Sequence, residues 1–265
     1  MPLSQDGTES PTAVGPDRLP VIDLKRDAIL LDVDGTLVDI APSPDEVRVP
    51  AGLRGTLFRL IGHANGALAL VSGRTLESID ALFAPLVTAA IGCHGAQMRR
   101  SPEAADMRRM PPLPEEIRLA CSDIQGLEPH VRIEDKTFTL AFHYRQAPYL
   151  EERLRALLHD RLAPFTAEYV LMEGKSVIEI KPRQCTKGEA LRALMGLPPF
   201  AGRRPVYFGD DTTDEYAFAV LPELHGIGIS VGRPMPGADY GVAAPRDIRR
   251  WLGRLAGNAR EEEGE

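Results

Sequence analysis

The segment "ILLDVDGTLVDI", from Ile29 to Ile40, decides the fold of this chain. Three apolar residues precede Asp32 and Asp34, and Gly35 follows at once. Residues two apart in a strand point to the same face, so both carboxylates are predicted to lie together at the carboxyl end of a buried strand. Two neighbouring carboxylates repel each other, and a hard divalent cation such as Mg²⁺ is the natural compensation. A capping aspartate followed by a turn is the alternative interpretation of these residues alone.

Composition limits the class of protein. The chain has 265 residues and a formal net charge of −7, which argues against a nucleic-acid binder because such proteins usually carry a basic surface. No apolar run approaches the roughly 18 residues of a membrane helix, so we expect no membrane association. The three cysteines are odd in number and form no C-x-x-C pair, which favours a reducing cytoplasm. Residues 1–24 are expected to form a disordered lead, and residues 258–265 an acidic tail.

Short apolar runs alternate with amphipathic helices over most of the chain. The runs end at Leu31, at Val71 and near His94, and others follow in "RPVYFG" and "GIGISVG". The stretch "SGRTLESIDALF" predicts a helix with Thr75 as its N-cap, and "YGVAAPRDIRRWLGRL" predicts another near the C-terminus. This alternation is typical of α/β proteins. We expect a Rossmann-like parallel-sheet core with helices on both faces, formed by residues 25–110 and 183–257.

The middle of the chain has a different pattern. The stretches "EEIRLACSDIQG" and "APYLEERLRALLHDRL" are predicted helices, and "VRIEDKTFTLAFHYR" alternates like a hairpin that turns at Glu134–Lys136. The stretch "EYVLMEGKSVIEIKP" predicts two strands that are broken at Glu173 and Gly174. We therefore expect a smaller inserted α+β cap domain over residues 111–182.

Two further segments carry groups that suit an anion. Ser72-Gly73-Arg74 follows the second apolar run, and its hydroxyl and guanidinium are positioned to take phosphate oxygens; a serine that only caps a helix is the alternative. Thr186 and Glu189 have the spacing of a capping box, so Lys187 falls in the first turn of a helix. A cation there opposes the helix dipole, which makes sense if an anion binds beside it. A solvated surface lysine is the other interpretation.

The segment "VYFGDDTTDE" places Asp210, Asp211 and Asp214 directly after another apolar strand. The carboxyl ends of parallel strands meet at one edge of a sheet. We therefore expect these acids to lie beside Asp32 and Asp34, where they would repel them in the absence of a cation. A solvated acidic loop is the alternative.

With these residues in place, the chain resembles the haloacid-dehalogenase-like phosphatases. Asp32-Val-Asp34-Gly-Thr is similar to their first motif, Ser72 to the second, Lys187 to the third, and "GDDTTD" from Gly209 to the fourth. Within that superfamily, "GCHGA", "GKSVIEIKP", "GDDTTDE" and the position of the inserted unit resemble the trehalose-6-phosphate phosphatases. The chain departs from that pattern at Gln97, where bacterial members often carry an acid.

The resemblance implies catalytic roles for four residues. Asp32 would attack phosphorus and form a phospho-aspartyl intermediate. Asp34 would protonate the departing sugar oxygen and then deprotonate water in the second step. Ser72 and Lys187 would balance the charge on the phosphate oxygens, which is the electrostatic task that dominates phosphoryl transfer.

The same resemblance implies a magnesium site. Mg²⁺ would be held by Asp32, by Asp34 through its backbone carbonyl, and by Asp210. It would offset the repulsion between the attacking carboxylate and the phosphate dianion. Asp211 and Asp214 would support the metal through its waters or through hydrogen bonds.

Substrate specificity is expected to come from the cap. In "GKSVIEIKP" the two isoleucines share one face of a strand and are expected to pack inward, which leaves Lys175 and Glu179 toward the cleft. The resemblance implies that this charged pair binds sugar hydroxyls; an exposed cross-strand salt bridge is the alternative. His94 and His143 are further candidate substrate-binding residues, although a lone histidine is more often structural.

The resemblance therefore predicts an enzyme. It implies a Mg²⁺-dependent phosphatase that hydrolyses trehalose 6-phosphate to trehalose and phosphate, with a small-molecule sugar phosphate as its partner and functional coupling to a trehalose-6-phosphate synthase. The alternatives are a phosphatase for another glycosyl or hexose phosphate, a non-catalytic phosphosugar sensor and a phosphomutase. The intact set of acidic motifs counts against the sensor, because binding alone has no need of a nucleophile.

Overall fold

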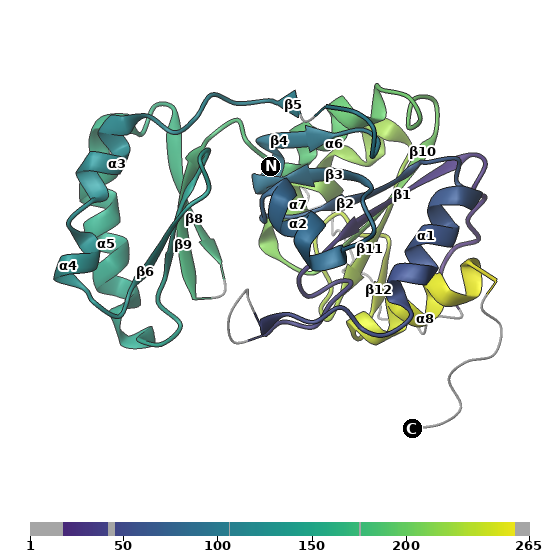
Figure 1. Ribbon diagram of the computed structural model, residues 1–265, viewed down its shortest axis with the longest axis horizontal. Helices are drawn as coiled ribbons and strands as arrows, with labels where there is room; N and C mark the ends of the chain where they lie inside the picture. The colour runs from purple at the N-terminus through teal and green to yellow at the C-terminus, as the bar shows by residue number, and fades with distance from the viewer. Residues whose placement is uncertain (1–17, 42–45, 106, 175, 258–265) are drawn as a thin grey trace, which may run out of the picture.

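The computed structural model describes residues 18–41, 46–105, 107–174 and 176–257. Residues 1–17 of the expected N-terminal lead, the expected tail over residues 258–265 and the candidate Lys175 lie outside the described residues. The prediction of disorder is wrong for the rest of the lead, because Leu19 and Ile22 pack in the hydrophobic core. Within them the chain forms two sheets, which Figure 1 shows in two units side by side.

The larger sheet has the strand order β12-β11-β10-β1-β2-β3-β4-β5 in the described part of the chain. Its parallel strands are β1 (Asp27–Asp32), β2 (Leu68–Val71), β3 (Ala89–Gly92), β10 (Arg204–Gly209), β11 (Ile227–Val231) and β12 (Tyr240–Val242). Two antiparallel strands, β4 (Gln97–Arg99) and β5 (Met107–Arg108), extend one edge. The predicted α/β core is confirmed. The sequence pattern gives no sign of the antiparallel edge, because these strands are too short to carry a hydrophobic period.

Helices cover both faces of this sheet. Ile29 and Leu31 pack on one face and Leu30 on the other, because successive residues of a strand point to opposite sides. The helices on the first face are α1 (Leu53–His63), α2 (Leu76–Phe83) and α8 (Pro245–Leu255), and those on the second are α6 (Lys187–Met195) and α7 (Thr212–Val220). The helices of the described ranges are all too short or too polar to cross a bilayer.

The helix starts nearest the carboxyl ends of the strands are fixed by side-chain caps. Thr75 Oγ1 accepts the Ser78 N–H at 3.1 Å, and Thr186 Oγ1 accepts the Glu189 N–H at 3.2 Å. Both caps are as the sequence predicts. Lys187 is therefore the first residue of α6, at the end of the helix that faces the strand ends.

The second unit is a smaller sheet with helices on one side. Its strands are antiparallel in the order β6 (Arg132–Asp135), β7 (Leu140–His143), β9 (Val177–Pro182) and β8 (Tyr169–Gly174). Its helices are α3 (Glu115–Cys121), α4 (Ile124–Leu127) and α5 (Glu151–Leu162). Two short 3-10 helices, η4 (Pro148–Leu150) and η5 (Ala163–Phe165), flank α5. This unit has a hydrophobic core of its own. We propose residues 111–182 as the cap domain, and residues 25–110 with 183–257 as the core domain.

Three local predictions in the cap are wrong in detail. The helix expected over "EEIRLACSDIQG" is divided into α3 and α4. The hairpin turns over residues 136–139, not at Glu134–Lys136, because β6 extends to Asp135, whose carboxylate accepts the Thr137 N–H at 2.7 Å and closes the turn there. The break expected at Glu173 and Gly174 is wrong, since both residues still pair with β9.

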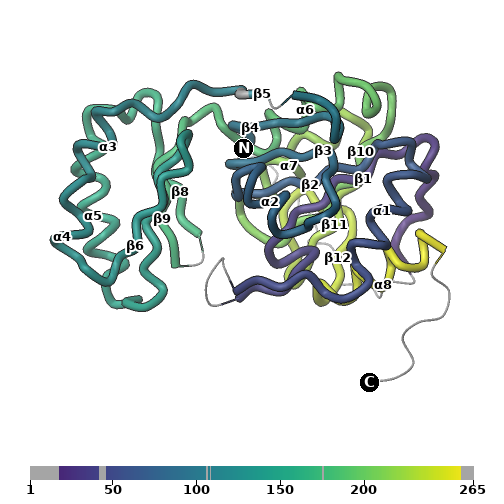
Figure 2. The backbone as a smooth tube through the Cα atoms, in the orientation of Figure 1, coloured from purple at the N-terminus to yellow at the C-terminus, as the bar shows by residue number. Residues whose placement is uncertain are grey.

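A small apolar cluster lies where the two units meet. We call it the junction cluster: Cys93, Ala96, Phe138 and Cys185, with Met110 packed against them. Cys93 belongs to η3 (Cys93–Gly95) after β3 in the core, while Phe138 lies in the hairpin turn of the cap. Met110 and Cys185 flank the two passages of the chain between the units, which Figure 2 traces. Both connections between the two units therefore pass beside the junction cluster.

Candidate active site

The candidate site lies where the carboxyl ends of the central strands face the cap. A cavity of about 420 Å³ opens there and is lined by residues of both units. β1 ends at Asp32, β2 is followed by Ser72, and β10 is followed by Asp210. Because these strands are neighbours in the sheet, three segments that are distant in sequence meet at one edge.

Asp32 and Lys187 form a buried ion pair at this edge. Lys187 Nζ lies 2.6 Å from Asp32 Oδ1, and the two residues are 2% and 4% exposed. The second carboxylate oxygen, Asp32 Oδ2, is buried and has no hydrogen-bond partner among the described residues. Leaving a buried acceptor without a donor costs free energy, so this oxygen is suited to bind a ligand.

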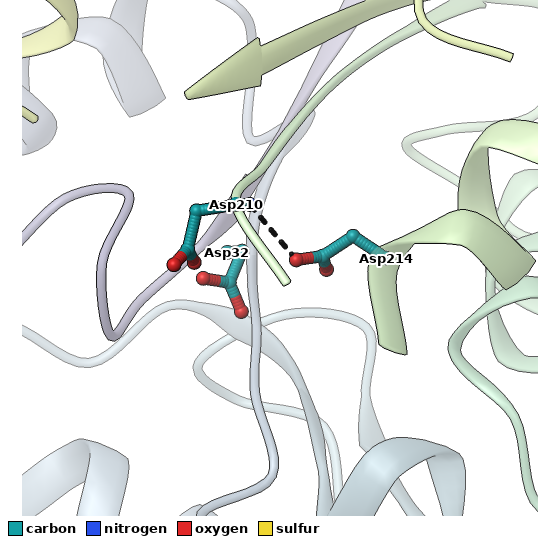
Figure 3. Close-up of side chains that lie close together, drawn as sticks. All are labelled: Asp32, Asp210 and Asp214. Atoms are coloured by element: carbon teal, nitrogen blue, oxygen red, sulfur yellow. Dashed lines mark hydrogen bonds between the residues drawn. The ribbon is translucent and has the colours of Figure 1, made fainter. Parts of the chain in front are cut away.

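Asp214 organises the groups around that pair. Its Oδ1 accepts hydrogen bonds from Lys187 Nζ and from the Tyr207 hydroxyl, each at 2.6 Å. Its Oδ2 accepts the backbone N–H groups of Asp210 and Asp211, each at 3.0 Å; Figure 3 shows the first of these contacts. Four donors therefore satisfy this carboxylate. Its contact with the N–H of Asp211, the N-cap residue, also completes the capping box that starts α7.

Asp210 is held close to the first strand by two neighbours. Thr36 Oγ1 donates to Asp210 Oδ1 at 3.3 Å. A Cβ atom on Gly35 would lie only 2.2 Å from Asp210 Oδ2, and Gly35 has φ +96°. Only glycine fits here, since a side chain would be strained and would push the Asp210 carboxylate away.

The carboxylates at this edge fit a divalent cation. Oxygen atoms of Asp32, Asp210 and Asp214 lie within 4.8 Å of one another. Burial, together with the charges of Asp214 and Asp210, raises the pKa of Asp32 well above its usual value, although Lys187 opposes this. Asp214 already accepts four hydrogen bonds, so Asp32 Oδ2 and Asp210 are the oxygens best suited to a hard cation.

Lys187 is positively charged in this setting. Burial would lower its pKa, but the carboxylates of Asp214 and Asp32 outweigh burial and raise the pKa above its usual range. The ammonium is therefore a fixed cation beside the carboxylate pair.

The segment Ser72–Arg74, which we call the phosphate loop after its predicted role, lies beside Asp34. The Arg74 N–H donates to Ser72 Oγ at 3.1 Å. The Arg74 guanidinium forms a two-pronged pair with Asp34, with Nε and one terminal nitrogen each 2.7 Å from a carboxylate oxygen. The sequence predicts that Arg74 takes phosphate oxygens; in this structure it holds the Asp34 carboxylate, and a contact with phosphate stays a prediction.

On the cap side, Glu179 faces the phosphate loop. Lys136 Nζ donates to Glu179 Oε2 at 3.1 Å, and His94 Nε2 lies 3.4 Å from the same oxygen. Burial would raise the pKa of Glu179, but Lys136 and His94 outweigh it and hold this pKa well below its usual range. Glu179 is therefore ionised, and its Oε1 is buried without a hydrogen-bond partner among the described residues.

A second acid and a histidine line the cap wall of the cavity. His143 Nε2 lies 2.8 Å from Glu134 Oε2, across the β6–β7 pair. This hydrogen bond holds the pKa of Glu134 below its usual value. Both residues line the cavity, so the cap presents hydrogen-bonding groups opposite the carboxylates of the core.

Most of the predicted site residues meet at this cavity. Those that line it are Asp32, Asp34, Ser72, Gly73, Arg74, His94, His143, Glu179, Lys187, Asp210 and Asp211. Asp214 lies behind them and acts through its hydrogen bonds, while Asp211 caps α7 by accepting the Thr212 N–H at 2.7 Å. Their chemical roles stay predictions.

Sequence patterns miss Thr36, Tyr207 and Lys136. Tyr207 sits in an apolar strand, where a buried hydroxyl needs a partner, and that need is the one signal the sequence offers. Thr36 and Lys136 look like ordinary turn residues. Their partners, Asp210 and Gly73, are visible only once the chain is folded.

An α/β core that carries an inserted cap over paired aspartates at a strand end is the architecture of the haloacid-dehalogenase-like phosphatases. A family model described as trehalose-phosphatase matches residues 30–239. With this match over most of its length, the chain belongs to the trehalose-phosphatase family.

Individual relatives agree with that membership. A probable trehalose-phosphate phosphatase of Sinorhizobium fredii is 40% identical over 239 residues, covering 87% of this chain and 88% of the relative. The trehalose-6-phosphate phosphatase of Escherichia coli is 38% identical over 226 residues, covering 85% of each chain. Among solved structures, a trehalose-6-phosphate phosphatase related protein superposes with a TM-score of 0.71 at 26% identity, covering 87% of this chain and 97% of that one.

Proposed function

We propose that this protein hydrolyses trehalose 6-phosphate to trehalose and inorganic phosphate. Family membership supports the substrate, and the cavity between a carboxylate edge and a polar cap wall supports the reaction class. The observation that carries the proposal is the Asp32 carboxylate, which has one oxygen held by Lys187 and the other buried without a partner among the described residues.

The reaction follows from this geometry in two steps. An oxygen of the Asp32 carboxylate attacks phosphorus, a new O–P bond forms, and the bond from phosphorus to the sugar oxygen breaks. Asp34, which is protonated in the enzyme–substrate complex, gives that proton to the departing oxygen. In the second step Asp34 takes a proton from water as the water oxygen attacks the phospho-aspartate, which releases phosphate and restores Asp32.

Charge balance is the task of the surrounding cations and donors. Lys187 and Ser72 stabilise the equatorial oxygens of the transferring group, where negative charge is spread in the transition state. Arg74 orients the Asp34 carboxylate through its two hydrogen bonds. Asp214 keeps the Lys187 ammonium in place.

We infer that Mg²⁺ is the cofactor. Asp32, Asp210 and the backbone carbonyl of Asp34 would hold it. The acidic cluster supports this choice, and so does Asp32 Oδ2, which lacks a donor in the described part of the chain. When bound, Mg²⁺ offsets the repulsion between the carboxylate and the phosphate dianion. Asp211 and Asp214 support the site through hydrogen bonds.

The cap is the proposed sugar-recognition surface. Glu179, His143 and His94 supply hydrogen-bonding groups, and Lys175 is proposed with them from the sequence. Glu179 Oε1, which no described residue contacts by a hydrogen bond, supports this role because a carboxylate oxygen readily accepts a sugar hydroxyl. We also propose a cytoplasmic location and functional coupling to a trehalose-6-phosphate synthase, the class of enzyme that must supply this substrate.

The test is a panel of sugar phosphates ranked by kcat/KM with Mg²⁺ present. We expect trehalose 6-phosphate to be the best substrate and chelation of the metal to stop turnover. A clear preference for glucose or mannose phosphates would contradict the proposal. Asp32→Asn should abolish turnover, whereas the matched Asp39→Asn, which removes an exposed surface carboxylate, should leave it unchanged.

A further inference from the structure

One lysine of the cap reaches into the core. Lys136 lies in the β6–β7 turn, yet its Nζ donates to the Gly73 carbonyl of the phosphate loop at 3.1 Å. The same ammonium donates to Glu179 Oε2, also at 3.1 Å. The Lys136 side chain is only 10% exposed, so these contacts are shielded from solvent. A shielded hydrogen bond between charged groups is stronger than its surface counterpart.

The Gly73 carbonyl is linked to the Ser72 side chain through a single peptide group. The Gly73 carbonyl and the Arg74 N–H belong to one planar peptide group, so a donor that fixes the oxygen also fixes the direction of the N–H. That N–H donates to Ser72 Oγ at 3.1 Å. Lys136 therefore sets, through one peptide group, the orientation of the hydroxyl proposed to bind phosphate.

His94 makes a second connection between the same groups. A Cβ atom on Gly73 would lie 2.5 Å from two atoms of the His94 ring, so the phosphate loop packs directly against this imidazole. His94 Nε2 lies 3.4 Å from Glu179 Oε2. Glu179 thus contacts two side chains, and both of them contact Gly73.

We propose that Lys136 is a positioning residue that couples sugar recognition by the cap to the phosphate loop of the core. The inference rests on the proposed function, since it takes Glu179 as a sugar ligand and Ser72 as a phosphate ligand. Glu179, the Lys136 ammonium and the Gly73–Arg74 peptide form one continuous chain of contacts that ends at Ser72. A cap that moves away removes the donor from Gly73 and leaves Ser72 without this support.

The test compares a sugar substrate with one that has no sugar. Turnover of trehalose 6-phosphate and of p-nitrophenyl phosphate is measured for the wild type, Lys136→Met and Lys136→Arg, with Lys25→Met as an exposed control. We expect Lys136→Met to lower kcat about tenfold on both substrates, the order expected for one buried charge-assisted hydrogen bond. Lys136→Arg keeps a donor and should recover part of the loss, and Lys25→Met should match the wild type.

A double-mutant cycle tests whether Lys136 acts through Ser72. On p-nitrophenyl phosphate, Lys136→Met should cost little further kcat in a Ser72→Ala background, because the hydroxyl it orients is already gone. Multiplicative losses would overturn the proposal. So would an unchanged rate of Lys136→Met on p-nitrophenyl phosphate with a loss confined to the sugar substrate, since Lys136 would then serve sugar binding alone.

Folding needs its own control, because Lys136→Met leaves the buried Glu179 carboxylate without its cation. The double variant Lys136→Met/Glu179→Gln removes that charge, and its Tm is measured alongside. We expect it to lose as much p-nitrophenyl phosphate turnover as Lys136→Met; recovery to the wild-type rate would overturn the coupling. A wild type that prefers another sugar phosphate would refute the proposed substrate, while the p-nitrophenyl phosphate cycle would still decide the coupling.

Discussion

The carboxylate of Asp214 lies 2.6 Å from the ammonium of Lys187, although the two residues belong to different helices, α7 and α6. The same carboxylate receives the backbone N–H groups of the loop that carries Asp210. One buried acid therefore fixes both the proposed phosphate-binding cation and a proposed metal ligand. Its loss is expected to disturb two parts of the site together.

Asp214→Asn should lower kcat by about 100-fold or more, because breaking a buried ion pair costs about 3–5 kcal/mol and displaces Lys187. Steady-state kinetics at saturating Mg²⁺ checks this. Glu215→Gln is the matched control on the same helix: this side chain is 39% exposed and does not line the cavity, so its kcat should stay within about threefold of the wild type. Equal losses in both variants would mean that the start of α7 tolerates neither change and that Asp214 has no special role.

Gly35→Ala should weaken the binding of Mg²⁺ by about tenfold or more, since the new Cβ would meet the Asp210 carboxylate at 2.2 Å. Gly52→Ala is a fair control, because Gly52 also has a positive φ, while a Cβ added there would have no atom of the described residues within 4 Å. Titration of activity with Mg²⁺ distinguishes the two. If Gly52→Ala weakens Mg²⁺ binding equally, general backbone strain explains the effect and the contact with Asp210 does not.

Arg74→Lys should slow trehalose 6-phosphate hydrolysis about tenfold, since lysine cannot hold both oxygens of Asp34 as the planar guanidinium does. Hydrolysis of p-nitrophenyl phosphate should fall less, because its leaving group needs little protonation. Arg204→Lys changes a similar two-pronged pair, with Asp27 at the opposite end of β1, and should leave kcat unchanged. An equal fall on both substrates would argue against an effect on protonation of the leaving group.

Glu179 should make the stability of the fold depend on pH. Its pKa in the folded protein lies below the ordinary value of 4.5, so the unfolded chain takes up this proton first as the pH falls. Its contribution is therefore complete above about pH 4.5 and is lost below it. Urea unfolding between about pH 6 and about pH 3.5 should show a steeper loss for the wild type than for Glu179→Gln. The exposed Glu116→Gln should keep the wild-type slope, and a wild-type slope in Glu179→Gln would contradict the prediction.

The sequence predicts those features of the fold that depend on residues close together in the chain or on the common edge where parallel strands end. The N-caps at Thr75 and Thr186 can be predicted because each threonine and the N–H that it accepts lie only three residues apart in the sequence. The place of Lys187 near Asp32 follows from parallel strands that end at one edge. Its position at the start of a helix, where a cation is locally unfavourable, is the signal that marks it for a site.

Contacts between distant segments cannot be predicted from local patterns in the sequence. Arg74 looks like a phosphate ligand because it follows a strand end, yet β1 and β2 are neighbours and bring Asp34 within reach of its guanidinium. Asp214 looks like one more acid, but the packing of α6, α7 and β10 supplies donors to both its oxygens. Lys136 looks like a turn residue until the cap is placed over the core.

The junction cluster bears on how such proteins diversify during evolution. The chain leaves the core beside Met110 and returns beside Cys185, and both side chains pack into the same small cluster. An insertion whose two ends lie close together can be exchanged by recombination without changing the strand order or the connections of the core sheet. Domain insertions of this kind are tolerated in many proteins. If the cap holds the leaving group as proposed, replacing the cap would change the substrate while the carboxylate edge of the core is kept.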